Sequence, residues 1–293
     1  MSACPLCGGA SAVALRTPDR NRGLSDVVFT YRRCEVCGSL WLENIPEDLS
    51  PYYPDDYYAR PDLARLRELG AGEAYRMALL APYATGGRLT EIGPGFGIFA
   101  VQAVDAGFDV TVIEMDRAMC EHLEATLGVR AVCSAEPERA LAELPPSRVI
   151  VMWHVLEHLR DPWATLDAAA ANLEPGGTLL IAVPNPEALG ARVLGGRWPH
   201  VDAPRHLFLI PARTLAERAR RAGLQAVHLT ADDPGARHWN AFAWHYALRR
   251  PQSRWITHRL AQAAGTAIAA VLAPVERRGL RGAAYTMVLQ KPT

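Results

Sequence analysis

The chain has 293 residues, which suffice for one large domain and one small domain that each bury a core. Lysine plus arginine equals aspartate plus glutamate at 31 each, so no overall positive field exists to gather nucleic acid or acidic lipid. The N-terminal residues lack the apolar run of a secretory signal, and the longest apolar stretch, 263–275, is too short to span a bilayer. We therefore expect a cytoplasmic protein without a transmembrane segment, for which nucleic acid is not the favoured partner.

Two identical cysteine pairs stand near the N-terminus. Cys4 and Cys7 form the first pair, Cys34 and Cys37 form the second, and a glycine follows each pair. Thiolates two residues apart bind one ion through a tight turn, and two such pairs complete a tetrahedral site. The pattern predicts a zinc ribbon over residues 1–45 with a structural zinc. Two disulfides are the alternative, which a reducing compartment disfavours.

The segment that follows, 46–85, is predicted to be an aromatic arm and a helical linker. Aromatic residues interleaved with prolines suit an irregular arm lying over a pocket, and packing of the linker onto the core explains them equally well. A helical pattern over 63–83 then leads into the next domain. The aromatic residues from 41 to 58 are Trp41, Tyr52, Tyr53, Tyr57 and Tyr58.

A glycine-rich turn follows the first strand-like run of the larger domain. Residues 91–97 read Glu-Ile-Gly-Pro-Gly-Phe-Gly, and Glu114 closes the next strand-like run. Glycines let the backbone approach a ligand, and a carboxylate at this distance can accept both hydroxyls of a ribose. A dinucleotide fingerprint would need its third glycine at position 98, where Ile98 stands. An adenosyl cofactor is therefore favoured over a pyrophosphate, and a glycine turn without a ligand is the alternative.

Strand-like runs alternate with helical stretches over residues 86–293. This order is typical of a mostly parallel sheet with helices on both faces, in which ligands bind outside the carboxyl ends of the strands. Strands are expected at 88–92, 109–113, 130–133, 148–153, 178–183, 225–229 and 284–290.

The motifs over 86–293 resemble those of class I S-adenosylmethionine (SAM) methyltransferases. The resemblance implies an α/β fold with a Rossmann-like seven-stranded mostly parallel sheet whose last strand runs antiparallel, beside the small N-terminal zinc ribbon. It implies that Glu91 lies near the methionyl end of the cofactor, Glu114 at the ribose, Met115 against the adenine and residues 134–136 near the adenine edge. The implied SAM-binding residues are Glu91, Gly93, Gly95, Phe96, Gly97, Glu114, Met115, Ala135, Glu136 and His154.

Histidines and a glutamate follow the fourth expected strand. If a helix begins directly after that strand, His154, Glu157 and His158 share one face. Such a face can hold a divalent ion or a proton relay. The segment 198–206 follows the fifth strand and is expected to bring His206 over the same pocket, with His200 and Asp202 as further candidates.

This pattern is similar to that of ubiquinone-pathway O-methyltransferases and small-RNA 2'-O-methyltransferases, which carry Glu-x-x-Glu-His and a later histidine as ligands of a divalent cation. Here His154 replaces the first glutamate, whereas Glu157, His158 and His206 match. The resemblance implies a second metal, and the extra imidazole shifts preference from magnesium toward zinc, manganese or iron.

Other interpretations of these residues stay open. His154 or His206 can serve as a general base without a metal, and Glu157 and His158 can simply brace the helix. The same letters spell an inverzincin protease motif, but the position downstream of a cofactor loop argues against a hydrolase. The expected catalytic residues are His154, Glu157, His158 and His206.

Lid insertions are expected near 185–210 and 232–282, the latter with a helix-like apolar run over 256–275. The second insertion suits a lid or a wall of the acceptor pocket, and a homodimer interface or a membrane-surface helix are alternatives. Arginines flank the apolar run or lie within it at Arg249, Arg250, Arg254, Arg259, Arg277 and Arg278.

A zinc module joined to a SAM domain also looks like sugar C-methyltransferases of antibiotic pathways. We therefore expect a SAM-dependent methyltransferase acting on a small-molecule acceptor, with O-methylation of a glycosyl or natural-product hydroxyl favoured. The alternatives are C- or N-methylation of a sugar or secondary metabolite, RNA methylation, and a non-enzymatic zinc-ribbon binding protein.

Overall fold

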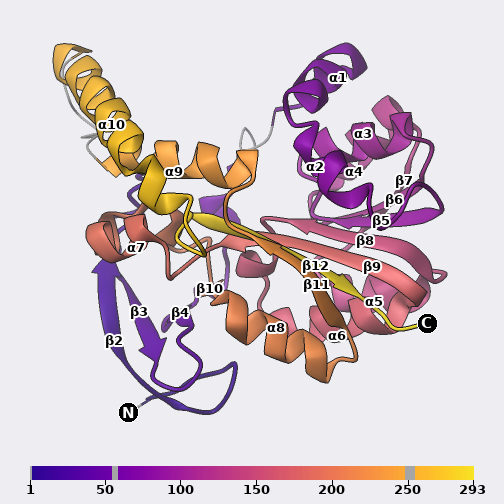
Figure 1. Ribbon diagram of the computed structural model, residues 1–293, viewed down its shortest axis with the longest axis horizontal. Helices are drawn as coiled ribbons and strands as arrows, with labels where there is room; N and C mark the ends of the chain where they lie inside the picture. The colour runs from indigo at the N-terminus through magenta and orange to yellow at the C-terminus, as the bar shows by residue number, and fades with distance from the viewer. Residues whose placement is uncertain (1, 55–58, 248–254) are drawn as a thin grey trace.

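Two β-sheets organise the chain (Figure 1). The computed structural model describes residues 2–54, 59–247 and 255–293. One sheet has five strands in the order β1-β2-β3-β4-β10, and the other has seven in the order β11-β12-β9-β8-β5-β6-β7. Five residues singled out above, Tyr57, Tyr58, Arg249, Arg250 and Arg254, lie outside the described residues.

The seven-stranded sheet forms the centre of the larger domain. Strands β5 to β9 pair in parallel, and β12 pairs antiparallel with both β9 and β11. The strands are β5 Arg88–Ile92, β6 Asp109–Glu114, β7 Arg130–Cys133, β8 Ser147–Trp153, β9 Leu173–Pro184, β11 Gln225–Thr230 and β12 Ala284–Gln290. All seven expected strands are confirmed. Only β9 differs by more than one residue from its expected bounds, since it begins at Leu173 instead of residue 178.

Helices cover both faces of this sheet (Figure 1). Alternate residues of β8 divide its side chains between two cores: Val149 and Val151 pack with helices α3 and α4, while Ile150 and Met152 pack with α5, α6 and α8. Because both faces are buried, the central strands are almost continuously apolar. The helices are α3 Ile98–Asp105, α4 Arg117–Leu127, α5 Pro137–Glu143, α6 Pro162–Asn172 and α8 Ala212–Arg221. The expected α/β fold with a Rossmann-like, mostly parallel sheet is confirmed.

The helical pattern predicted over 63–83 corresponds to two helices in the structure. These helices are α1 Leu63–Gly72 and α2 Tyr75–Leu80. Glu73, which directly follows α1, has a non-helical backbone conformation and ends that helix. Gly70 and Gly72 lie in the last turn of α1. Glycine is a poor helix former, so these residues favour the end of the helix at this point. The break turns α2 toward the seven-stranded sheet, where Tyr75 contacts Trp153 at the end of β8.

The five-stranded sheet contains the cysteine hairpins. Its first four strands are β1 Ser2–Ala3, β2 Ala10–Thr17, β3 Phe29–Cys34 and β4 Leu40–Leu42, and we call residues 2–42 the cysteine ribbon. Its fifth strand, β10 Phe208–Leu209, comes from the larger domain and pairs antiparallel with β4, with Phe208 opposite Trp41. The two modules therefore share one sheet and one continuous core.

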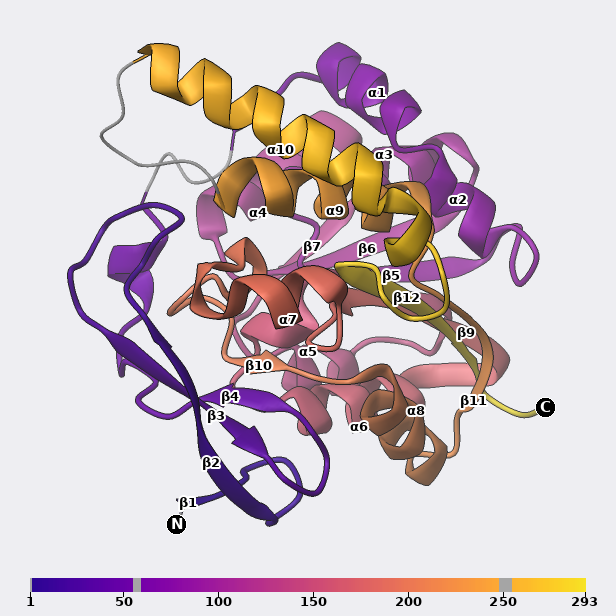
Figure 2. The same ribbon diagram turned by 60° about the vertical axis from the view of Figure 1, so that its left-hand side comes forward.

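Two insertions lie at the edge of the larger domain. The first contains α7 Leu189–Leu194 and the 3-10 turns Gly195–Arg197 and Pro199–Val201, and the second contains α9 Pro234–Ala247 and α10 Trp255–Glu276. Figure 2 shows α10 lying across α9. The expected helix over 256–275 is confirmed with one more residue at each end. Among the described helices, none has the length and apolar character to cross a bilayer.

Candidate functional site

The turn between β5 and α3 has the shape that its glycines predict. Gly93, Gly95 and Gly97 have φ values of +64°, +54° and +95°, in the left-handed region that favours glycine. A Cβ atom on Gly93 would lie 2.5 Å from Cγ2 of Val155, and one on Gly97 would lie 2.6 Å from Cδ2 of Leu123. The turn sits at the carboxyl end of β5, where the strand order reverses, so its backbone lines the expected ligand crevice.

Glu114 ends β6 beside this turn and is almost fully buried. Its Oε1 atom accepts hydrogen bonds from the backbone N–H groups of Met115 at 2.8 Å and Asp116 at 3.0 Å. Burial raises the pKa of the carboxyl, and these N–H donors act against the rise. The backbone thus fixes the orientation of the carboxylate before any ligand binds.

The residues expected around an adenine ring lie next to Glu114. The side chain of Met115 is 64% exposed, although it is large and apolar. The N–H of Ser134 donates to the carbonyl of Glu114 at 2.9 Å, and the Ser134 hydroxyl accepts from the N–H of Glu136 at 3.1 Å. The loop after β7, which contains Ala135, is therefore held against the loop after β6.

Glu91 provides a buried carboxyl on β5 below the glycine turn. Burial raises its pKa to about 8, against the favourable charge of Arg76 from α2. Its Oε2 atom has no hydrogen-bond partner among the described residues. A buried carboxyl oxygen without a partner is suited to a cationic or hydrogen-bond-donating ligand.

A second polar cluster lies after β8. Glu157 and His158 belong to a 3-10 turn, Leu156–His158, and His206 precedes β10. Ligand atoms of these three side chains lie within 4.8 Å of one another. The helix considered directly after β8 is only a single 3-10 turn with Val155 as its N-cap, and an α-helix begins only at Pro162.

Hydrogen bonds set the tautomers of the two histidines in this cluster. Nδ1 of His158 lies 3.0 Å from the carbonyl of Arg205, and Nδ1 of His206 lies 2.8 Å from the carbonyl of His200. A carbonyl only accepts hydrogen bonds, so each Nδ1 carries a proton, and in the neutral ring this tautomer leaves the lone pair on Nε2. Burial lowers the pKa of His158 to about 4 and keeps its ring neutral.

The carboxylate of Glu157 has no hydrogen-bond partner on either oxygen within the described part of the chain, although it is almost fully buried. Burial raises its pKa. Buried carboxylates are normally hydrogen-bonded or bound to a cation. Two imidazoles and one carboxylate without a hydrogen bond therefore form a donor set that fits a divalent metal.

His154 stands beside this cluster rather than in it. Its Nε2 atom accepts a hydrogen bond from the indole N–H of Trp239 in α9 at 3.1 Å, and its Nδ1 lies 3.5 Å from Oε1 of Glu157. With Nε2 occupied, Nδ1 carries the proton, so the ring offers no lone pair to a metal or a substrate. His154 also has a φ of +57°, an uncommon backbone conformation that clusters at functional sites.

The further candidates Asp202 and His200, and the aromatic arm, differ in how close they lie to the polar cluster. Oδ2 of Asp202 lies 3.9 Å from Nε2 of His206, whereas the ring of His200 packs against Trp239. Within the described part of the arm, the hydroxyl of Tyr53 lies 3.0 Å from Nδ1 of His158. By contrast, Tyr52 packs against Phe29. One arm residue thus reaches the polar cluster while another packs onto the core.

The four ribbon cysteines form a separate cluster. Their sulfur atoms lie within 4.8 Å of one another, with Cys4 to Cys37 at 3.9 Å and Cys7 to Cys34 at 3.4 Å. All six cysteines lie in the described ranges, and all are unbridged. Four converging sulfurs match a tetrahedral metal site.

The structure places Arg76, Asp19 and Arg205 at these sites, although the sequence indicated no role for them. The guanidinium of Arg76 lies over the ring of Trp153 at 4.9 Å, and Arg205 pairs with Asp19. The sequence signal was weak, because Asp19 and Arg205 stand 186 residues apart. The position of Arg205 directly before His206 was the only hint.

Comparisons with known proteins find related sequences. A family model described as a methyltransferase domain matches residues 63–229. A ubiquinone biosynthesis O-methyltransferase of Bordetella avium is 30% identical over 159 residues, which cover 50% of this chain and 65% of that protein. The corresponding enzyme of Xanthomonas axonopodis is 29% identical over 163 residues, which cover 52% of this chain and 67% of that protein.

Solved structures share the fold at low sequence identity. A SAM-dependent methyltransferase from Archaeoglobus fulgidus has a TM-score of 0.52 and 17% identity, covering 77% of this chain and 94% of that chain. An N-methyltransferase from Haemonchus contortus, solved with phosphomonomethylethanolamine and S-adenosylhomocysteine, has a TM-score of 0.57 and 15% identity, covering 97% and 68% of the two chains.

Proposed function

This chain belongs to the methyltransferase-domain family and is a class I SAM-dependent methyltransferase, and on that premise we propose that it methylates a hydroxyl oxygen of a small molecule, with a glycosyl or natural-product acceptor favoured. The observation that carries the proposal is the cluster of Glu157, His158 and His206. The turn that bears Glu157 begins after Val155, whose side chain touches the space above Gly93. The polar cluster that would act on the acceptor hydroxyl would therefore lie next to the glycine turn that would bind the donor.

The donor would be held by residues of the first three parallel strands. Glu114 would accept the ribose hydroxyls, Met115 would cover the adenine, and Glu91 would face the cationic methionyl end. When bound, SAM supplies an electrophilic methyl group on a sulfonium, which is a good leaving group. The chain then has to orient the acceptor in line and take up its proton. The remaining contacts would come from Gly93, Gly95, Phe96, Gly97, Ala135 and Glu136.

Glu157, His158 and His206 would hold a divalent ion. Two imidazole nitrogens and one carboxylate favour zinc, manganese or iron over magnesium. When bound, the ion lowers the pKa of an acceptor hydroxyl and orients it. The hydrogen bonds from each Nδ1 to a backbone carbonyl are the outer contacts that usually fix metal-binding histidines. His154 would support the cluster through its contact with Glu157.

A second candidate is metal-free base catalysis by His206. Its Nε2 carries a lone pair, and the nearby Asp202 carboxylate would stabilise the imidazolium formed when the acceptor proton is taken up. Metal binding is favoured because it also accounts for the unpartnered carboxylate of Glu157.

The cysteine ribbon would bind one structural zinc ion through Cys4, Cys7, Cys34 and Cys37. All four coordination positions would be filled by thiolates, so this ion would take no part in catalysis. Its role would be to hold the hairpins of the ribbon together.

Electron paramagnetic resonance with Mn²⁺ tests the metal proposal. We expect one bound Mn²⁺ per chain in the wild type, strongly weakened binding in Glu157→Gln, and no change in Glu143→Gln, an exposed glutamate on α5. Equal binding by all three proteins would eliminate the cluster as the site. Oxygen methylation is tested with ¹³C-methyl SAM and a panel of sugar and phenol acceptors, since the carbon shift of the product distinguishes O-, N- and C-methyl groups.

A further inference from the structure

We propose that Asp19 and Tyr31 of the cysteine ribbon are positioning residues for the methyl-transfer site, acting through residues 199–207, which we call the His206 loop. The inference rests on the proposed function of His206. It assigns the ribbon a role beyond binding its own metal, because contacts from the ribbon would set the position of a side chain at the reaction centre. Three independent sets of contacts support it.

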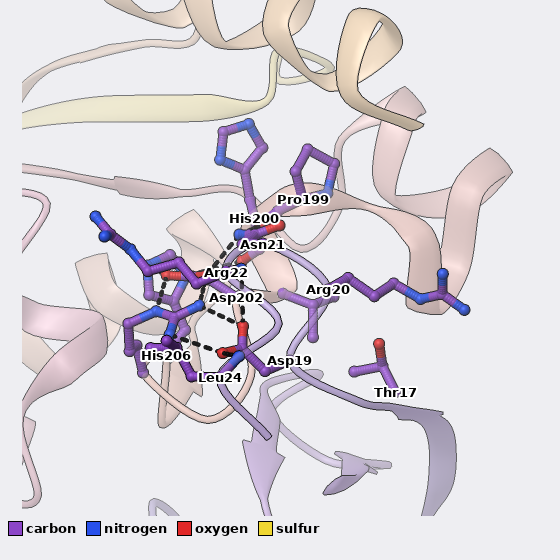
Figure 3. A network of polar contacts seen from close by, with 12 residues as sticks. Thr17, Asp19, Arg20, Asn21, Arg22, Leu24, Pro199, His200, Asp202 and His206 are labelled. Atoms are coloured by element: carbon purple, nitrogen blue, oxygen red, sulfur yellow. Dashed lines mark hydrogen bonds and ion pairs between the residues drawn. The ribbon is translucent and has the colours of Figure 1, made fainter. Parts of the chain in front are cut away.

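The first set is a buried ion cluster. The guanidinium of Arg205 has no exposed side-chain surface, and its Nη2 lies 2.7 Å from Oδ1 of Asp19 and 2.7 Å from Oδ1 of Asp202. Figure 3 shows Asp19 and Asn21 of the ribbon facing Asp202 and His206. A buried guanidinium is costly unless its charge and its N–H groups are matched. One of the two matching carboxylates comes from the ribbon, so the conformation around Arg205 depends on ribbon docking.

The second set joins the ribbon directly to the backbone of His206. The hydroxyl of Tyr31 lies 2.7 Å from the carbonyl oxygen of His206 and 3.2 Å from that of Val201. Tyr31 is fully buried on β3, so its hydroxyl has no competing solvent. The donated hydrogen bond fixes the peptide group next to the imidazole that carries the free Nε2.

The third set runs from the ribbon sheet to Glu157. The N–H of Leu42 on β4 donates to the carbonyl of Leu207 at 2.9 Å, and the N–H of Leu207 donates to the carbonyl of Glu157 at 2.7 Å. Leu207 thus lies between the ribbon and the 3-10 turn. In addition, the carbonyl of Arg205 accepts from Nδ1 of His158. All three members of the polar cluster are therefore held by a backbone that the ribbon contacts.

These contacts predict a separation between donor binding and chemistry. Glu91 and Glu114 lie on β5 and β6 of the other sheet, so loosening the His206 loop should leave the donor site intact. A displacement of about 1 Å at the reaction centre costs on the order of a hundredfold in rate. A ribbon substitution should therefore lower kcat and spare the affinity for the donor.

The test compares Asp19→Asn and Tyr31→Phe with the control Asp26→Asn, an exposed aspartate of the same ribbon loop. Proton–nitrogen spectra of ¹⁵N-histidine-labelled protein report the tautomer and hydrogen bonding of His206, identified by its loss in His206→Gln. Calorimetry with S-adenosylhomocysteine reports the donor site. We expect altered His206 signals in Asp19→Asn and Tyr31→Phe, unchanged signals in Asp26→Asn, and donor affinity within about twofold throughout.

The inference is overturned if both ribbon variants keep the His206 signals of the wild type, or if donor affinity falls in parallel with the change in those signals. If Asp19→Asn does not fold, Tyr31→Phe decides alone, because it removes one hydroxyl and leaves the ion cluster intact. Once an acceptor is known, kcat should fall about tenfold or more in both variants while KM for SAM stays constant. Absence of O-methyl transfer or of Mn²⁺ binding in the wild type refutes the proposed function, whereas the histidine spectra still decide the positioning role.

Discussion

Replacing Gly93 with alanine tests the assignment of the cofactor turn. At φ +64° an alanine costs about 1–2 kcal/mol in backbone strain. Its Cβ would also lie 2.5 Å from Cγ2 and 3.1 Å from Cγ1 of Val155, and overpacking of this kind costs about 1–3 kcal/mol. We therefore expect Gly93→Ala to lower the free energy of unfolding by about 2–5 kcal/mol.

Gly128 provides a matched control. It caps α4 with a φ of +67°, and a Cβ atom there would have nothing within 4 Å. Gly128→Ala should therefore cost only the strain of about 1–2 kcal/mol. The difference between the two variants isolates the contact with Val155, and Val155→Ala in the Gly93→Ala background should restore about 1–3 kcal/mol.

Urea unfolding followed by circular dichroism measures these free energies, and calorimetry with S-adenosylhomocysteine measures the donor site in the same proteins. Gly93→Ala should weaken the donor more than Gly128→Ala does, because the displaced turn lines the crevice. The reasoning fails if the two alanine variants are equally unstable, or if Val155→Ala brings no recovery in the double variant.

Four further outcomes are expected. Glu114→Gln should weaken S-adenosylhomocysteine about tenfold to a hundredfold, because hydrogen bonds to a charged acceptor are worth about 1.5–3 kcal/mol each; an unchanged affinity in calorimetry would remove Glu114 from the site. The pKa of Glu91 rises from 4.5 to about 8 on folding, so the folded donor-free protein keeps a proton that the unfolded chain loses over that range, and its stability should fall as pH rises from about 4.5 to 8. Glu91→Gln should flatten that slope in urea titrations at pH 5, 7 and 9, and a slope equal to that of the wild type would mean that another group causes the pH dependence. Trp239→Phe should cost about 1 kcal/mol and shift the ¹⁵N signals of His154, because Nε2 loses its donor. Cys7→Ser should lower the zinc content by up to one ion per chain and reduce the melting temperature, and mass spectrometry that finds the same zinc content as in the wild type would exclude the ribbon site.

Local signals made much of the larger domain predictable. The strands follow from short apolar runs between turns, and the glycine turn follows from three closely spaced glycines directly after such a run. The acidic end of β6 was predictable for the same reason, since Glu114 directly follows its apolar run. These features depend on neighbours in the sequence.

Features that depend on distant partners were not predictable. The 3-10 turn at Leu156–His158 replaces a helix because its backbone bonds go elsewhere, as when the carbonyl of Glu157 accepts from Leu207. That His154 offers no ligand atom to the cluster of Glu157, His158 and His206 was equally hidden, because its Nε2 accepts a hydrogen bond from Trp239, which comes 85 residues later. Likewise, the two-residue strand Phe208–Leu209 is too short to give a periodic pattern, and its partner lies in another module.

The pairing of β4 with β10 has a consequence for biosynthesis. The ribosome releases residues 40–42 long before residues 208–209, so the growing chain carries an unpaired strand edge while most of the protein is being made. Non-local pairings of this kind slow folding and expose the nascent chain to aggregation. Truncated products that stop before residue 208 should accordingly be insoluble, even though they contain every cysteine of the chain.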